Sequence, residues 1–230
     1  MNYFPSVIPG VITSISLSLI SLPVLAQSIP DGTTLTDVLP NQMVQGDLAE
    51  SITGGFSLNG STIHSFRDFN IDLGQRVYFQ NLVGIDNIIA RITGNNGSNI
   101  FGTLGVDGGA NLFLINPNGI TFGVEASLDL RGSLFATTAT DIELNDGSLL
   151  NISSAAPDAL LSIDPNAIFP NALRNYQGSI QSFADLTINE SQSLSLVADV
   201  VEMKMSGLGS QVGIQDETSF FFDKPVVKRH

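Results

Sequence analysis

Hydrophobic residues along the chain occur in short runs separated by Gly, Asn and Asp. The runs are Val77-Tyr78-Phe79, Ile88 to Ile92, Leu112 to Ile115, Leu134 to Thr138, Leu186-Thr187-Ile188, Leu194 to Val197 and Val200-Val201. Each has the length of a β-strand and is bounded by turn residues, and no long stretch has the 3.6-residue apolar period of a helix. The pattern predicts a nearly all-β fold.

Similar segments recur along the chain at solenoid-like spacing. They are GTLGV at 102–106, ASLDL at 126–130, GSLL at 147–150 and GSIQS at 178–182. The longer last step contains Pro157, Pro165 and Pro170, as expected of a loop that leaves one coil. In a parallel β-helix, strands of successive coils stack about 4.8 Å apart and their apolar side chains fill one interior column. We therefore predict such a coil, with a β-sandwich as the alternative, because short strands alone do not separate the two.

The segment ANLFLINPNGITFG, residues 110–123, places a strong turn between two apolar runs. Pro117 suits the first corner of a turn, and Gly119 tolerates a positive φ. Asn116 and Asn118 are each able to bond the backbone two residues later. We predict a rigid turn that is displayed on the surface, with its flanking arms anchored in the core.

The amino terminus has the features of a secretory signal peptide. Residues 1–26 contain no charged side chain, and the apolar stretch from Val11 to Leu25 ends in Val24-Leu25-Ala26. This V-x-A pattern predicts cleavage between Ala26 and Gln27. A membrane anchor is the alternative, but the apolar core is short for a span and has prolines on both sides. Nothing after Gln27 is apolar for long enough to cross a bilayer as a helix, so the mature chain is not expected to span a membrane.

Charge and cysteine content narrow the possible partners. The net charge is −13, which argues against nucleic acid or anionic lipid as a partner. The chain has no cysteine, so its stability must come from packing and backbone hydrogen bonds rather than from disulfides.

Three segments together resemble a known family. They are HSFRDFNIDLGQRVYF at 64–79, NIIARITGNNGSNIFGTL at 87–104 and NLFLINPNGITFG at 111–123. They are similar to the amino-terminal secretion domain of filamentous-haemagglutinin-type exoproteins, the substrates of two-partner secretion, in a form seen in cyanobacteria. The resemblance covers roughly residues 30–200. It implies an all-β, right-handed parallel β-helix, a pectin-lyase-like solenoid, with an amino-terminal capping region.

The resemblance also implies a function, a partner and a location. In this family the domain follows a cleaved signal peptide through the periplasm of a Gram-negative-type cell, is recognised by the POTRA domains of an outer-membrane transporter, and leads the exoprotein to the cell surface. Asn116, Pro117, Asn118, Gly119 and Ile120 match the NPNGI motif implicated in secretion, and Asn70 matches a second segment. The resemblance implies no catalytic residue, cofactor or metal. Whether the motif contacts the transporter or nucleates folding stays open.

The resemblance divides the chain into a signal peptide (1–26), a secretion domain (27–210) and a divergent tail (211–230). The tail, with Phe220-Phe221-Phe222 followed by basic residues, is interpreted as an improvised cap or an end outside the family pattern. Exoproteins of this family normally continue as a long stalk. We therefore expect a short exoprotein, a truncated form that lacks the stalk, or a domain that acts through a partner encoded nearby.

Other residues suggest rival functions. Asp141 and Glu143 would share one strand face, with Asp146 nearby, as in β-helical carbohydrate-active enzymes. A carbohydrate-binding surface protein is disfavoured by the absence of Trp. His64 beside Ser65 lacks the sequence context of a triad and is expected to be a satisfied or surface histidine. Asp107-Gly108-Gly109 faintly resembles a calcium motif but occurs once. We predict neither catalytic nor metal-binding residues.

Overall fold

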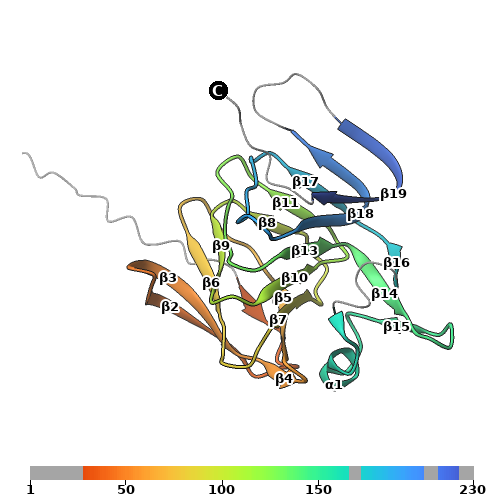
Figure 1. The fold of residues 1–230 in the computed structure, drawn as a ribbon, viewed down its shortest axis with the longest axis horizontal. Coiled ribbons are helices and arrows are strands. Elements are labelled where there is room, and N and C mark those ends of the chain that lie inside the picture. Colours follow the sequence, from red (N-terminus) through yellow and green to blue (C-terminus); the bar gives the residue numbers. More distant parts are fainter. Residues whose placement is uncertain (1–27, 166–171, 205–211, 223–230) are drawn as a thin grey trace, which may run out of the picture.

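The computed structural model describes residues 28–165, 172–204 and 212–222. The predicted signal peptide and its cleavage site lie outside these residues. The chain winds into a parallel β-helix, which confirms the fold expected from the sequence (Figure 1). Two packed antiparallel sheets, the alternative, are not the arrangement of the described strands.

Each coil has three faces, and strands of successive coils stack in parallel on each face. Face one contains β5 (Ser61–Asp68), β7 (Asn87–Ile92), β10 (Asn111–Ile115), β13 (Leu134–Thr137) and the first half of β18 (Leu194–Met203). Face two contains β8 (Ser98–Ile100), β11 (Ile120–Phe122), β17 (Ser179–Ser182) and the second half of β18. Face three contains β3 (Asp47–Gly54), β6 (Arg76–Gln80), β9 (Thr103–Asp107) and β12 (Ser127–Asp129).

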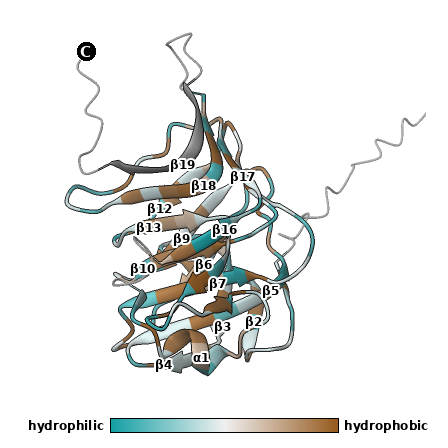
Figure 2. Cartoon of the chain, turned by 90° about the vertical axis from the view of Figure 1, so that its right-hand side faces the viewer, coloured by the Kyte–Doolittle hydropathy of each residue, from teal (hydrophilic) through white to brown (hydrophobic). Residues whose placement is uncertain are grey.

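The core is one continuous interior column. On face one Leu112 lies in register between Ile88 and Leu134, and all three are almost fully buried. Figure 2 shows the stacked strands with hydrophobic residues distributed through them. Because side chains alternate across a strand, every second residue of each run enters the column. This alternation explains why the sequence contains strand-length apolar runs without a long hydrophobic segment.

An amino-terminal cap begins the coil, as expected. β1 (Ile29–Pro30) and β4 (Phe56–Leu58) pair antiparallel with β5, and β2 (Thr36–Val44) pairs antiparallel with β3. At the other end β19 (Val212–Phe222) pairs antiparallel with β18. This pairing covers the edge of the last parallel strand, which an uncapped solenoid would leave open.

One excursion interrupts the coil between β13 and β17. It contains β14 (Ala139–Glu143), β15 (Leu149–Asn151), the short helix α1 (Pro157–Leu161) and β16 (Leu173–Tyr176). The three strands form an antiparallel sheet. Its apolar side chains, with those of α1, pack on the outside of face one in a second cluster that includes Ile89, Phe113, Ile142 and Leu160. The predicted loop is therefore a folded unit that covers one outer face.

Three details of the predicted repeat are wrong. GSLL forms β15 in the excursion, and GSIQS forms β17 on face two, whereas GTLGV and ASLDL stack in register on face three. The segment Leu186-Thr187-Ile188 is not a strand, although Leu186 and Ile188 pack half-buried against the core. A glycine-serine corner followed by apolar residues marks the start of a strand, but it does not specify the face on which that strand stacks.

Candidate functional site

The NPNGI turn connects face one to face two, between the end of β10 and the start of β11. Its backbone closes through a hydrogen bond of 3.1 Å from Gly119 N to Asn116 O. Asn116 Oδ1 accepts a second bond of 2.9 Å from Asn118 N, which is the predicted bond to the backbone two residues later. Gly119 has a φ of +112°, a backbone conformation that residues with a Cβ atom rarely adopt. The local chemistry expected of the turn is confirmed for Asn116 and Gly119.

The prediction that the turn is displayed is wrong for most of it. Asn116 is 0% exposed, Ile120 is 1% exposed, Pro117 and Gly119 are also buried, and only Asn118 is exposed. The side chain of Asn118 does not bond its own later backbone. Instead it donates to Gly94 O at 2.8 Å in the preceding coil. The turn is buried because corners of neighbouring coils stack on both sides of it.

The side chain of Asn116 uses its full hydrogen-bonding capacity. Its amide nitrogen donates to Asn96 O and to Ser98 Oγ, both at 3.0 Å. Its oxygen accepts from both the backbone and the side-chain nitrogen of Asn118. A carboxylate would lack the two donors and an alanine would lack all four bonds, so an asparagine side chain is what this buried corner requires.

The next coil packs closely on the other side of the turn. Asn116 N donates to Thr137 O at 3.0 Å, and Thr138 Oγ1 donates to Gly178 O at 2.9 Å. A Cβ on Gly178 would lie 2.4 Å from Gly119 N, a distance that the backbone does not allow. The excursion therefore leaves and rejoins the coil directly on top of the NPNGI turn.

The hydrogen bonds of the Asn70 side chain go to β8 of face two and not to the turn. Its Oδ1 accepts from Asn99 N at 2.9 Å and from Asn99 Nδ2 at 3.2 Å. Asn99 lies in β8, where it pairs in register with Thr121 of β11. Asn70 thus supports the strand on which the strand after the turn stacks. We call Asn70, Asn96, Asn116 and Asn118 the asparagine corner.

Arg91 is a buried residue that holds several parts of the fold together, and the sequence did not reveal this role. It projects from the outer side of β7, is 2% exposed, and donates to Ser65 Oγ at 2.7 Å. It also donates to the carbonyls of Ile152 at 2.9 Å and Ala155 at 2.6 Å, and to Thr33 Oγ1 at 3.2 Å. Burial lowers its pKa, and nearby Asp31 opposes that effect. One cation therefore joins the cap, face one and the excursion. The signal for it was a charged residue inside the apolar run NIIARI.

The structure does not assemble a hydrolytic triad around His64. The imidazole is 1% exposed and points into the column, where Nδ1 lies 3.1 Å from Thr36 Oγ1. Burial lowers its pKa to about 4, so it is neutral at pH 7. Ser65 points to the opposite side of β5, toward Arg91. His64 was expected to be either satisfied or at the surface. It is buried, and it is satisfied at Nδ1 only, because Nε2 has no partner among the described residues.

The acidic residues of the excursion are each held by their own partners. Burial acts to raise the pKa of Asp141, but hydrogen bonds from Thr140, Asn175 and Asn151 together lower it. The bond from Asn175 Nδ2 is 2.9 Å and the bond from Asn151 Nδ2 is 3.2 Å. Glu143 forms an ion pair of 2.6 Å with Arg174. The two carboxylates share a strand, as predicted, but each has its own partners.

The remaining candidates have structural roles. Gly108 and Gly109 form a corner in which Asn81 Oδ1 accepts from Gly109 N at 2.9 Å. In the part of the chain that the structure describes, no group of three or more His, Asp or Glu residues is placed to hold a metal ion. None of the helices in the same residues is long and apolar enough to cross a bilayer.

Comparisons with known proteins agree with this architecture. A family model described as "TPS secretion domain", for two-partner secretion, matches residues 26–218. The solved filamentous hemagglutinin secretion domain is similar with a TM-score of 0.51 and 20% sequence identity, over 78% of this chain and 59% of that one. The HMW1 secretion domain from Haemophilus influenzae gives a TM-score of 0.45 and 23% identity, over 74% of this chain and 40% of that one.

No curated protein sequence matches the chain. The chain spans 59% of the filamentous hemagglutinin secretion domain and 40% of the HMW1 domain. The likeness to the filamentous hemagglutinin secretion domain, at 20% identity, shows the fold alone. The family match covers most of the residues that form the β-helix and its cap. The chain belongs to the family of two-partner-secretion (TPS) domains.

Proposed function

We propose that this domain directs an exoprotein to the cell surface through an outer-membrane transporter whose POTRA domains recognise it. In this proposal residues 1–26 are removed before Gln27, and the mature chain crosses the periplasm before it reaches the transporter. The observation that carries the proposal is the family match over residues 26–218, on a chain that folds as a capped β-helix. The V-x-A pattern at Ala26 supports the cleavage step.

The coil suits export through a narrow pore. Each strand of face one pairs with the strand of the coil before it, from β5 through β7 and β10 to β13. Such nearest-neighbour stacking lets coils form one after another as the chain emerges. Folding outside the cell would then bias movement of the chain outward without a nucleotide.

Recognition by the transporter takes place, in this proposal, before the domain folds. An extended segment that pairs with the edge of a POTRA sheet must offer free backbone groups. Leu112–Ile115, a natural apolar candidate, lies in β10, which pairs with β7 on one side and β13 on the other. In the folded domain this segment has no free edge, so only an unfolded chain could present it.

The asparagine corner acts through folding in this proposal. Asn116 is fully buried with a saturated amide, so a partner protein has no access to it in the folded domain. Asn118 is the exposed member of the turn and makes fewer bonds. Variants of these two residues can therefore distinguish a role of the motif in folding from direct recognition of the motif by the transporter.

The test is export of variants from cells that co-express the transporter. Asn116→Ala leaves buried partners unsatisfied and is expected to reduce both the exported amount and the stability of the purified domain. Asn118→Ala is expected to change both much less, and Asn145→Ala, at an exposed site in the excursion, serves as the matched control. Normal export of a destabilised Asn116→Ala chain would contradict the folding role. Reduced export of a stable Asn118→Ala chain would instead show that the motif is read directly.

We also propose that the domain has no catalytic activity. The support is that Asp141 and Glu143, the carboxylates considered for glycoside cleavage, are bonded to Asn175 and Arg174 in the excursion sheet. Polysaccharide hydrolysis by the purified chain that disappears in Asp141→Asn would overturn this part of the proposal.

A further inference from the structure

The two edges of β11, the strand that follows the NPNGI turn, are covered by very different parts of the chain. On its first edge β11 pairs in parallel with β8 of the preceding coil. On its second edge it pairs with β17, where Ile120 lies in register with Ile180. The whole excursion, from β14 to β16, lies between β11 and β17 in the sequence. The turn and β11 therefore gain their neighbour on the second edge only after the excursion has been passed.

Folding of the excursion is what brings β17 to this edge. The excursion closes where Thr138 Oγ1 donates to Gly178 O at 2.9 Å, across 40 positions of sequence. Beside this bond, Ala139 of β14 lies in register with Tyr176 of β16, so these two strands must pair for Gly178 to reach its place. A chain that adds coils from its cap stacks β13 on β10 before the excursion forms. During that interval β10 has both edges paired, but the second edge of β11 is free.

Gly178 is the residue that covers the turn when this edge closes. A Cβ on Gly178 would lie 2.4 Å from Gly119 N and 2.7 Å from Asn118 C, and backbone atoms cannot move aside as a flexible side chain can. At the far end of β11, Phe183 N donates to Phe122 O at 2.9 Å. The backbone groups of β11 that β17 uses are thus available to another extended strand until Gly178 is in place.

We propose that the second edge of β11 binds one extended strand of a POTRA sheet in the partly folded chain, and that β17 displaces this strand when Gly178 packs on Gly119. The inference rests on the proposed function and adds to it a docking position and a release step. Main-chain hydrogen bonds to the strand edge hold the partner. Release needs no energy source, because β17 is tethered to the same chain and competes at a high effective concentration. A turn that is buried in the folded domain is in this way available to a partner during export.

The test compares Gly178→Ala with Gly109→Ala, a matched control at a corner glycine that has open space around it. Amide hydrogen exchange of the folded Gly178→Ala protein should show protection lost in β11 and β17 but retained in β5, β7 and β10. The same variant should bind the purified periplasmic part of the transporter roughly tenfold or more tightly than the folded wild type. The reason is that apparent affinity rises with the fraction of chains in which the edge is free. Gly109→Ala should match the wild type in both measurements.

Three results would overturn the inference. The first is continued protection of β11 in Gly178→Ala and in the bulkier Gly178→Val, and the second is a free β11 edge without tighter binding. If the substitutions unfold the whole chain, pulse-labelled exchange during refolding of the wild type decides, because β7 and β10 must become protected before β11. Simultaneous protection of these strands is the third result. An unfolded wild-type chain that fails to bind the transporter would instead refute the proposed recognition itself.

Discussion

Replacing Arg91 with methionine would test whether one buried cation holds the cap and the excursion on the coil. Methionine fills much of the volume of the arginine stem but donates no hydrogen bond. The change leaves four acceptors without their donor, namely Ser65 Oγ, Thr33 Oγ1 and the carbonyls of Ile152 and Ala155. The last two belong to the excursion, 61 and 64 residues farther along the chain.

The magnitude follows from these four bonds. A hydrogen bond to a charged group contributes about 1.5–3 kcal/mol, and such contributions do not add fully. Leaving a buried acceptor without its donor costs about 1–3 kcal/mol, so the loss for four acceptors should reach at least about 3 kcal/mol. We expect Arg91→Met to lower the free energy of unfolding by that amount. With a urea dependence of about 1–3 kcal/mol per M, the midpoint of unfolding should fall by at least ~1 M.

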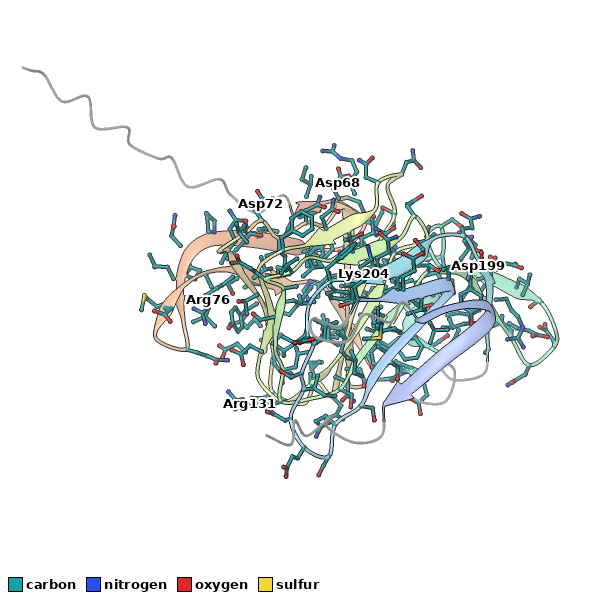
Figure 3. All side chains as sticks on the ribbon, turned by 90° about the horizontal axis from the view of Figure 1, so that it is seen from above. Asp68, Asp72, Arg76, Arg131, Asp199 and Lys204 are labelled. Carbon is teal, nitrogen blue, oxygen red and sulfur yellow. The ribbon has the colours of Figure 1, made fainter. Side chains whose placement is uncertain are left out.

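Urea unfolding of the mature chain measures this effect, and Arg131→Met is the matched control. Arg131 is exposed, and Figure 3 shows it at the rim of the fold. The control should change stability by less than about 0.5 kcal/mol. Amide hydrogen exchange should show the largest loss of protection in β14–β16, because Arg91 binds the segment that follows β15 and so helps to hold this sheet on the coil. A loss below about 1 kcal/mol, or equal loss of protection throughout the coil, would refute this account of Arg91.

Two further predictions concern Gly105 and His64. Gly105→Ala would place a methyl group 2.3 Å from Tyr78 Cε1, whereas Gly109 has open space around it. Thermal unfolding should show a loss of about 1–3 kcal/mol for the first change and almost none for Gly109→Ala, and equal melting temperatures would contradict this. Burial lowers the pKa of His64 from 6.5 to about 4. Between these pH values the histidine is protonated in the unfolded chain but neutral in the folded one. The free energy of unfolding should therefore be unaffected above pH 6.5 and should fall by about 3 kcal/mol as the pH drops to 4. His64→Gln should remove that component from the pH dependence of urea unfolding, and an unchanged profile would exclude it.

The fold was predictable from the sequence because each coil repeats the same local chemistry. Apolar runs such as Leu112–Ile115 form strands wherever turn residues bound them, and stacking in register follows from their shared alternation. The face on which a strand stacks was not predictable for GSIQS or GSLL. That choice depends on the path of the chain through the excursion, which places Leu173 of β16 against β14 and brings residue 178 back onto the turn.

The candidate site was predictable only in its local part. The bond from Asn118 N to Asn116 Oδ1 joins two residues of one turn, so the local sequence is enough to predict it. The burial of the turn depends on Gly178, far along the chain, and no local pattern reports that contact. Arg91 was missed for the same reason, because its acceptors extend from Thr33 to Ala155.

The bonds of Asn116 refine the idea that the turn nucleates folding. Three are internal to the turn, where the oxygens of Asn116 accept from Asn118 N, Asn118 Nδ2 and Gly119 N. Two reach the preceding coil, where the side-chain nitrogen donates to Asn96 O and Ser98 Oγ. A further bond, from Asn116 N to Thr137 O, belongs to the following coil. In a chain that adds coils from its amino-terminal cap, these contacts must form in that order. Asn116 then links successive coils rather than acting as an isolated folding nucleus. Its loss should slow the folding of every coil added after it while leaving the earlier coils intact.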